Sequence, residues 1–192
     1  MTIRIRSDEI VTVCGRRKFG KTTFAKHILG AFDRRRVYDP NGEYVEFEDR
    51  FVPHSSEPYE PFFDDCWRSG NLELCVDEAD KVWPLHKPLR GAFYNIVHLG
   101  AHRNLGLIAI TRRVANLHKD VFSQSNHVFI FSQFIKGDIE YLQDCGVEDA
   151  EKVRKLPRWW CYYWNPETTE MILLPPLELP TVQTASAQGA HY

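Results

Sequence analysis

The chain has 192 residues, of which 43% are hydrophobic and 26% are charged, and its formal net charge is −2. This balance predicts one soluble globular domain and excludes attraction to nucleic acid or membranes by overall charge, so such a partner must meet a local patch. Five scattered cysteines without a C-x-x-C pair predict reduced thiols, and no apolar run approaches the roughly 18 residues of a membrane helix, so we expect a cytoplasmic protein.

A glycine-rich segment near the start of the chain carries the clearest chemical pattern. Residues 15–22 read Gly-Arg-Arg-Lys-Phe-Gly-Lys-Thr and fit the phosphate-binding pattern G-x-x-x-x-G-K-[ST]. The flanking residues predict a buried strand over 9–14 and a helix over 22–29, which is the context that this motif requires. Backbone N–H groups of such a loop surround the β-phosphate, and the helix N-terminus adds partial positive charge. The segment predicts a nucleotide phosphate site formed by Gly15, Lys18, Phe19, Gly20, Lys21, Thr22 and Thr23.

Two side chains at the end of this loop have specific chemical roles in the prediction. Lys21 can reach the β- and γ-phosphates, and the hydroxyl of Thr22 can ligate Mg²⁺. The preceding basic residues, Arg16, Arg17 and Lys18, predict a solvated turn that strengthens phosphate attraction, in preference to a contact with DNA.

The residues on either side of this site predict two further strands. Residues 2–6 alternate apolar and charged side chains, which predicts a short edge strand. Residues 37–39 predict a strand, and residues 40–42 predict a turn after it. Asp39 and Glu43 flank this turn, and they fit turn stabilisation and a supporting role at the nucleotide site equally well.

A second apolar segment ends in acidic residues. Residues 72–80 read Leu-Glu-Leu-Cys-Val-Asp-Glu-Ala-Asp, which predicts a buried strand that ends at Asp77 and is followed by Glu78. In this Walker B pattern Asp77 is placed to hold Mg²⁺ with Thr22, and Glu78 to orient the water that attacks the γ-phosphate. The paired carboxylates favour hydrolysis over phosphorylation of a small molecule. A solvated acidic turn is the alternative, which the phosphate loop upstream disfavours.

The rest of the chain predicts alternating helices and strands followed by a hairpin. Residues 52–70 predict a loop with one short helix, 88–99 an amphipathic helix, 107–110 and 128–131 buried strands, and 138–145 and 148–156 helices. Aromatic residues 159–164 with residues 170–174 predict a terminal hairpin, and base stacking is a less favoured function for the aromatic run. We therefore predict one ATPase domain over residues 1–175 and a flexible, proline-led tail over 176–192.

This order predicts an α/β fold with a mainly parallel central sheet flanked by helices. Ligands in such sheets bind beyond the carboxyl ends of the strands. Because Gly15, Asp77 and Thr111 all stand at predicted strand ends, we expect them to converge on one crevice.

Hydrolysis also needs positive charge near the transition state, which arginines commonly supply. Arg112 and Arg113 follow the predicted strand over 107–110 and are placed to sense the γ-phosphate. Arg103 lies in the loop after the amphipathic helix, where it could serve the nucleotide of a neighbouring subunit. The loop from Arg112 to Lys119 is also a candidate contact for a DNA backbone.

Several of these motifs together resemble the FtsK/HerA superfamily of P-loop ATPases. Residues 37–44 (Val-Tyr-Asp-Pro-Asn-Gly-Glu-Tyr) look like the strand and Asp-Pro-x-Gly-Glu-Tyr turn of HerA-like members, and residues 75–79 are similar to their Walker B motif. Residues 102–113 look like the arginine, glycine, apolar strand and Thr-Gln-Arg segment that follows. Arg112 replaces the usual glutamine sensor, and Val128-Phe129 stand where a family arginine is expected, which directs the prediction of a trans-acting arginine to Arg103.

The compact chain resembles, within this superfamily, the genome-packaging ATPases of membrane-containing icosahedral viruses. The resemblance implies a RecA-like fold of the additional-strand, catalytic-glutamate type. It also implies a Mg²⁺-dependent ATPase that forms a ring, expected to be a hexamer, on double-stranded DNA. Capsid or membrane proteins at a packaging vertex are candidate partners, in the host cytoplasm or on the virion.

Two other functions stay open at this point. One is an assembly or extrusion ATPase that acts on protein, as in filamentous phages, although those proteins usually carry a membrane helix. The other is a nucleotide-binding structural subunit or switch that does not hydrolyse ATP. A GTP switch is disfavoured because the sequence has no Asn-Lys-x-Asp motif.

Overall fold

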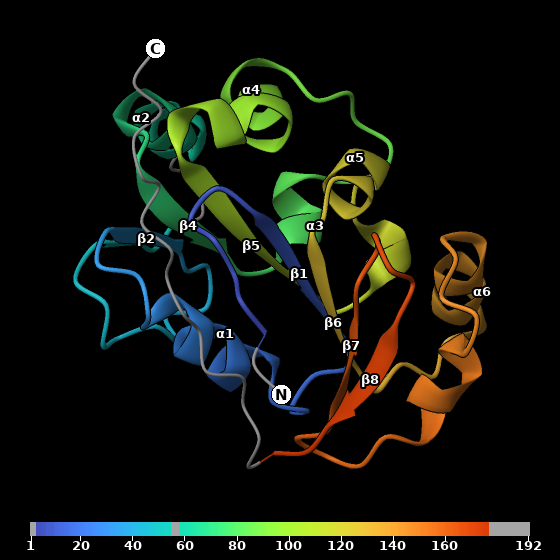
Figure 1. Cartoon of the computed structure of the whole chain (residues 1–192). Coiled ribbons are helices and arrows are strands. Elements are labelled where there is room, and N and C mark those ends of the chain that lie inside the picture. Colours follow the sequence, from blue (N-terminus) through green and yellow to red (C-terminus); the bar gives the residue numbers. More distant parts are fainter. Residues whose placement is uncertain (1–2, 55–57, 177–192) are drawn as a thin grey trace.

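A computed structural model describes residues 3–54 and 58–176, and its centre is an eight-stranded sheet (Figure 1). The strand order across the sheet is β3-β2-β4-β5-β1-β6-β7-β8. In chain order the strands are β1 (Ile10–Cys14), β2 (Arg35–Tyr38), β3 (Arg50–Phe51), β4 (Leu72–Val76), β5 (Leu105–Thr111), β6 (His127–Phe131), β7 (Cys161–Trp164) and β8 (Met171–Leu174). All pairs among β1–β6 are parallel, and β7 and β8 add an antiparallel hairpin at one edge. The predicted mainly parallel α/β sheet and its terminal hairpin are therefore confirmed.

Helices cover both faces of this sheet (Figure 1). They are α1 (Lys21–Leu29), α2 (Glu60–Ser69), α3 (Ala79–Val82), α4 (Gly91–Leu99), α5 (Lys119–Ser123) and α6 (Lys136–Asp144), with 3₁₀ turns at Gly100–Arg103, Val114–Asn116 and Ala150–Lys155. One face packs against α1 and the other against α2, α3 and α4. Along β4, Leu72, Leu74 and Val76 face the second group, whereas Cys75 faces α1. This alternation explains why the central strands are mostly apolar on both faces, as is usual for parallel strands covered on both sides.

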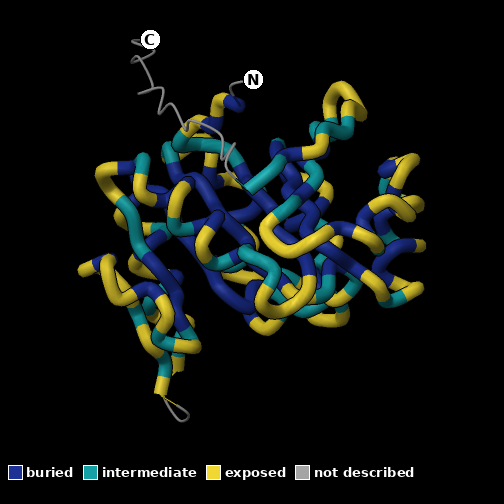
Figure 2. The backbone as a smooth tube through the Cα atoms, turned by 90° about the horizontal axis from the view of Figure 1, so that it is seen from below, coloured by how far each residue is buried: buried dark blue, intermediate teal, exposed yellow. Residues whose placement is uncertain are grey.

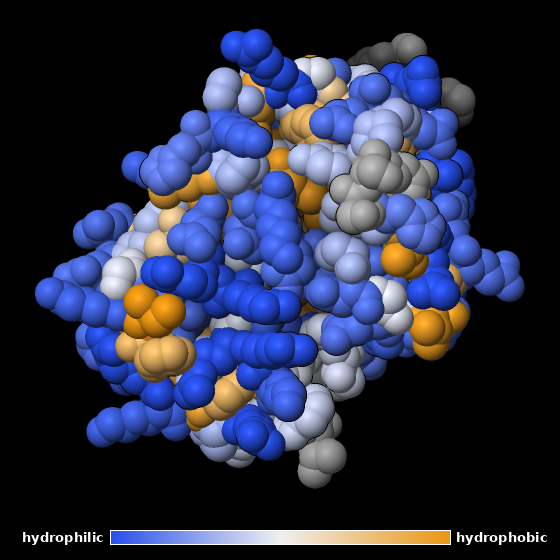
Figure 3. All heavy atoms as spheres, turned by 180° about the vertical axis from the view of Figure 1, so that it is seen from behind, coloured by the Kyte–Doolittle hydropathy of each residue, from blue (hydrophilic) through white to orange (hydrophobic). Residues whose placement is uncertain are grey.

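The central strands lie inside the molecule, whereas the outer loops are exposed (Figure 2). Strands β1, β4, β5 and β6 are buried at every position. The face seen in Figure 3 is mostly hydrophilic, with hydrophobic side chains in small separate groups. Within the described ranges, no helix is both long and apolar enough to cross a membrane.

The structure differs from the predicted elements in several short segments. Residues 3–6 form no strand, although Ile3 and Ile5 are buried in the core on the α1 side and Arg4 and Arg6 are exposed, as the alternation predicted. The two-residue strand β3 and the five-residue helix α5 were not predicted, because elements this short show no periodicity. The predicted helix over 148–156 is a 3₁₀ turn. The predicted tail lies almost wholly outside the described residues, which end at position 176, and the domain division stays a prediction.

The parallel strands bring the carboxyl ends of β1, β4, β5 and β6 to one edge of the sheet. The chain leaves β1 at Gly15, whose N–H donates to the Thr111 carbonyl at the end of β5 over 3.2 Å. The N–H of Arg16 donates to the carbonyl of Ser132, just beyond β6, over 2.9 Å. The start of the phosphate loop is thus fixed to the two strands beside β1.

Glu73 on β4 is a buried carboxyl away from this edge. Both its oxygens are buried without a hydrogen-bond partner among the described residues, and one lies 2.2 Å from where a Cβ at Gly106 would stand. Burial, with repulsion from Glu9 and Asp8, raises its pKa well above 4.5. The folded state therefore keeps a proton that the unfolded chain releases, and stability falls as the pH rises from about 4.5 towards the folded-state pKa.

Glu73→Gln is expected to remove this pH dependence, because glutamine keeps the shape and does not ionise. The variant's free energy of unfolding minus that of the wild type should increase by roughly 1 kcal/mol for each pH unit in that window. Urea unfolding at pH 5, 6 and 7 measures this difference. Parallel stability curves for the two proteins would show that Glu73 does not bind the proton.

Candidate active site

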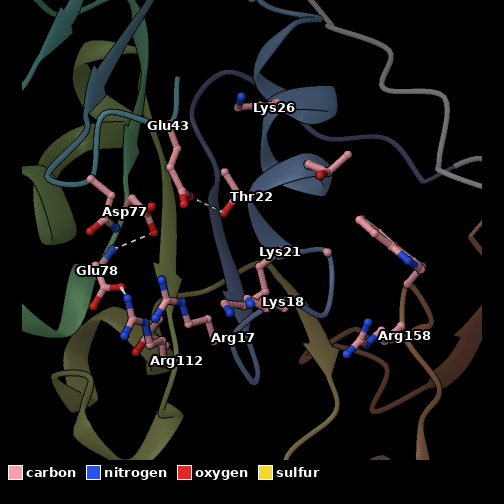
Figure 4. A pocket seen from close by; sticks show the side chains of 15 residues that line it. Arg17, Lys18, Lys21, Thr22, Lys26, Glu43, Asp77, Glu78, Arg112 and Arg158 are labelled. Atoms are coloured by element: carbon pink, nitrogen blue, oxygen red, sulfur yellow. Dashed lines mark hydrogen bonds and ion pairs between the residues drawn. The ribbon is translucent and has the colours of Figure 1, made fainter. Parts of the chain in front are cut away.

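A cavity of about 670 Å³ opens at the carboxyl ends of the strands (Figure 4). Most of its lining side chains are polar or charged, and they come from the phosphate loop, α1, the segments after β2, β4 and β5, and the loop before β7. The lining residues are Arg17, Lys18, Gly20, Lys21, Thr22, Thr23, Lys26, Asn41, Glu43, Asp77, Glu78, Thr111, Arg112, Arg158 and Trp159. The expected crevice therefore exists, and Asp77 and Thr111 line it. Gly15 does not line it, but its N–H donates to the carbonyl of Thr111 in the cavity wall.

The backbone of the phosphate loop curls in a way that few sequences allow. Gly15, Lys18 and Gly20 all have positive φ, at 144°, 65° and 109°. At Gly15 a Cβ would lie 2.5 Å from the Cβ of Phe131, so only glycine fits between β1 and β6. Turns of this kind direct N–H groups inward, and α1 then begins at Lys21 with its N-terminus towards the cavity. The loop can therefore bind the phosphates of a nucleotide.

Lys21 is the buried cation of this loop. Its Nζ donates to the carbonyl of Arg16 over 2.9 Å, which folds the side chain back over the loop. Burial lowers the pKa of Lys21, and the neighbouring carboxylate of Asp77 opposes that shift. A bound phosphate would supply further negative charge to this poorly hydrated ammonium group.

Oxygen-bearing side chains face the start of α1 from the ends of β2 and β4. The hydroxyl of Thr22 donates to Glu43 Oε2 over 3.3 Å, and Asp77 Oδ1 accepts from the N–H of Glu78 over 2.9 Å (Figure 4). Burial raises the pKa of Asp77 to about 6, and repulsion from Glu78 and Glu43 adds to the shift. Carboxylate and hydroxyl oxygens are the ligands that Mg²⁺ prefers, and a cation there would relieve this repulsion. Thr22 and Asp77 thus fit the predicted metal site.

Asp39 acts in the structure as the support of the turn that carries Glu43. Its fully buried carboxylate accepts from the N–H of Glu43 at 2.9 Å and of Tyr44 at 3.0 Å, and it pairs with Arg50 Nη1 at 3.3 Å. Of the two roles open for Asp39, the geometry matches turn stabilisation. Glu43 itself reaches the cavity.

Glu78 follows Asp77 with a left-handed backbone, φ 54° and ψ 43°, and its carboxylate is buried at the cavity wall. One oxygen forms an ion pair with Nη2 of Arg112 (Figure 4). The other oxygen lies 3.3 Å from Nζ of Lys81. The hydroxyl of Thr111, at the end of β5, donates to Asp80 Oδ1 over 2.8 Å. The acidic turn after β4 is thus bound to the end of β5, with Glu78 and Arg112 in contact.

The other predicted arginines do not reach this cavity. Arg113 turns to the buried carboxylate of Asp138 on α6, at 3.2 Å. Arg103 lies before β5, where it donates to the carbonyl of Arg68 over 2.8 Å and stacks on Trp67. The seven residues of β5 span about 20 Å at roughly 3.3 Å per residue and separate Arg103 from Arg112. Of the three arginines predicted to act at the transition state, Arg112 is therefore the one that lines the cavity of its own chain.

The residues that line the cavity are not identical to the predicted site residues: some predicted residues do not line it, and some residues outside the prediction do. Phe19 does not line the cavity, because its ring packs on the core cluster and under the guanidinium of Arg16, and Gly15 lies behind the wall. Arg158 and Trp159 do line it, although the aromatic run was predicted to form a strand from Trp159 onward. The strand begins only at Cys161. Nothing in the local pattern indicated that the loop before β7 reaches the phosphate loop.

Comparison with known proteins gives structural relatives only. No family model matches the chain, and no curated protein matches it in sequence. The genome packaging NTPase B204 from Sulfolobus turreted icosahedral virus 2, in complex with ATP-gammaS, aligns at a TM-score of 0.77 and 23% identity, over 88% of this chain and 98% of that one. B204, the DNA-packaging ATPase from Sulfolobus turreted icosahedral virus, gives 0.75 and 22%, over 88% and 98%.

A more distant neighbour is the N-terminal domain of zonular occludens toxin from Neisseria meningitidis. It aligns at a TM-score of 0.55 and 11% identity, over 86% of this chain and 93% of that one. The structural neighbours are thus those that the sequence resemblance predicted, a viral genome-packaging ATPase and FtsK/HerA-like ATPases. At these identities the likeness establishes architecture, and the chain therefore has the P-loop NTPase fold of these proteins.

Proposed function

We propose that this chain is a Mg²⁺-dependent ATPase that moves double-stranded DNA, in the packaging of a viral genome into a preformed capsid. One observation carries the proposal: a phosphate loop faces paired acidic residues in a chain that aligns with nearly all of a viral genome-packaging NTPase. The solved complexes of that NTPase with ATP-gammaS and AMPPCP support ATP as the ligand of the phosphate loop in this chain.

The proposed chemistry assigns a role to each group in the cavity. The loop N–H groups and Lys21 bind the β- and γ-phosphates, and Mg²⁺, held by Thr22 and Asp77, would offset the phosphate charge when bound. Glu78 orients a water for attack on the γ-phosphorus and accepts its proton. Arg112, beside Glu78, is the candidate for sensing the γ-phosphate and stabilising charge in the transition state. The position of Glu78 supports its role, because its buried carboxylate lines the cavity beside Asp77.

DNA translocation and the ring are the parts of the proposal that rest most on the structural relatives. Within a ring, Arg103 could act only on the nucleotide of a neighbouring subunit, because it lies beyond the far end of β5. Of the predicted DNA-contacting loop, Arg112 and Lys119 are exposed, whereas His118 caps α5 by accepting from the N–H of Asp120. Capsid or membrane proteins at a packaging vertex remain proposed partners.

We expect double-stranded DNA to stimulate ATP hydrolysis by the full chain, with a ring-sized, expected hexameric, mass in the same samples. The assay measures phosphate release with and without DNA at low salt, because phosphate contacts weaken steeply as salt rises. Light scattering reports the mass. Hydrolysis that is neither stimulated by DNA nor accompanied by DNA binding would contradict translocation and leave the ATPase in place.

The alternative is an assembly or extrusion ATPase that acts on protein. The likeness to the zonular occludens toxin domain favours it, but that likeness is weaker, at a TM-score of 0.55 against 0.77. A non-hydrolysing nucleotide-binding subunit is the third candidate, and it predicts no ATP turnover with any partner.

A further inference from the structure

The cavity has a second end that the phosphate chemistry does not use. Asp77, Glu78 and Arg112 lie on one side of the loop, and Arg158 lies on the other, across Lys21 and Thr22 (Figure 4). The carboxylates and the proposed metal site fix the γ-phosphate end of a bound nucleotide on the first side. The sugar and base must then extend away from the carboxylates, towards the loop that holds Arg158 and its neighbour Trp159.

Trp159 is placed there by a strained backbone. Its φ is 73°, a region that bulky side chains rarely adopt, and its N–H donates to the carbonyl of Phe19 in the phosphate loop over 3.1 Å. The ring lies against Gly20, since a Cβ at that position would stand 2.8 Å from Cε3 of Trp159. The residue is nevertheless 50% exposed and lines the cavity. One part of the indole thus packs on the loop and the rest is open to a ligand.

The antiparallel hairpin explains how this residue reaches the site. Strand β7 pairs with β6 so that Cys161, its first residue, stands opposite Phe131, the last residue of β6. The residues just before β7 therefore lie at the carboxyl edge of the sheet, beside the phosphate loop. No second aromatic side chain lines the cavity among the described residues.

We propose that Trp159 is the base-binding residue of this site and stacks on the purine ring of the nucleoside triphosphate. The inference rests on the proposed nucleotide site and adds the surface that receives the base. Stacking on an indole is strongest for the larger rings, so purine nucleotides bind more tightly than pyrimidine nucleotides. Arg158, an exposed cation next to the ring, borders the same end of the cavity.

The test compares ATP with inorganic tripolyphosphate, which carries the same phosphates without a base. Trp159→Ala in the full chain should weaken ATP binding by about 5- to 100-fold, the range expected for the loss of one aromatic stack. It should change the affinity for tripolyphosphate by less than about twofold. Trp159→Phe keeps a stacking ring and should retain most of the affinity for ATP.

A fluorescence measurement gives a second readout. ATP should quench the indole signal of the wild type, tripolyphosphate should not, and the quench should disappear in Trp159→Phe. Trp160→Phe is the matched control, because Trp160 packs on the α6 side of the core and does not line the cavity. ATP should therefore still quench the fluorescence of this variant.

Two results would overturn the inference while leaving the nucleotide site intact. Equal weakening of ATP and tripolyphosphate by Trp159→Ala would show that the ring only supports the loop at Gly20. Unchanged ATP affinity would show that the base lies elsewhere. Failure of the proposed nucleotide site would look different, because the wild type would then bind neither ATP nor tripolyphosphate. Failure of DNA translocation alone would leave both of these affinities unchanged.

Discussion

Replacing Glu78 with glutamine is expected to leave ATP binding in place and to slow hydrolysis by about 10²-fold or more. Glutamine has the shape of glutamate and can still hold a water, but it cannot accept the proton that the water loses. The buried position of Glu78 at the end of β4, with its carboxylate at the cavity wall, makes it the group best placed for that proton. Single-turnover hydrolysis and the affinity for ATP, measured on the same samples, separate the chemical step from binding.

The matched control for this substitution is Glu46→Gln, since Glu46 is exposed and pairs with Lys26 outside the proposed chemistry. Its rate of hydrolysis should stay close to that of the wild type. Turnover that is unchanged in Glu78→Gln would transfer the role of the base to another group. The absence of turnover in both the wild type and the variant, with ATP still bound, would instead favour the structural-subunit alternative.

Lys21→Ala should remove nucleotide binding, with a loss of roughly 10²-fold or more in affinity, equivalent to about 3 kcal/mol. The ammonium group of Lys21 is buried among the loop and the carboxylates, where a charge interacts more strongly than in water. Isothermal titration with a non-hydrolysable ATP analogue measures the loss directly, without interference from turnover.

Lys26→Ala provides the comparison for that measurement. Lys26 lies on the same helix and also lines the cavity, but its Nζ is held by Glu46 at 2.9 Å. We expect it to cost at most a few-fold in affinity. A loss in Lys26→Ala as large as in Lys21→Ala would mean that general positive charge, rather than the specific position of Lys21, binds the phosphates.

The parts of the site that could be predicted from sequence are those in which chemistry and local pattern coincide. Residues 15–22 and 72–80 are continuous segments whose glycines, lysine and carboxylates stand at fixed distances from a buried strand. The parallel topology then required their strand ends to meet. The structure places Lys21, Thr22, Asp77 and Glu78 around one cavity, as the sequence predicted.

The remaining site residues depend on pairings that no local pattern encodes. Trp159 reaches the phosphate loop because β7 runs antiparallel to β6, and a reader of the sequence cannot tell that direction from the residues 159–164 alone. The separation of Arg103 from Arg112 likewise follows from their positions at opposite ends of β5. Short elements such as β3 escaped prediction because two residues show no period.

Because Arg112 contacts Glu78, a bound nucleoside triphosphate and a bound diphosphate should affect the Arg112 guanidinium group differently. In the proposed site, only a triphosphate places a third phosphate near Arg112, and it would draw that side chain away from Glu78. A diphosphate has no group at this position, so the ion pair stays formed and Glu78 stays occupied by Arg112 and Lys81. Activation of water would then begin only after the substrate has arrived, and each round of hydrolysis would restore the resting arrangement.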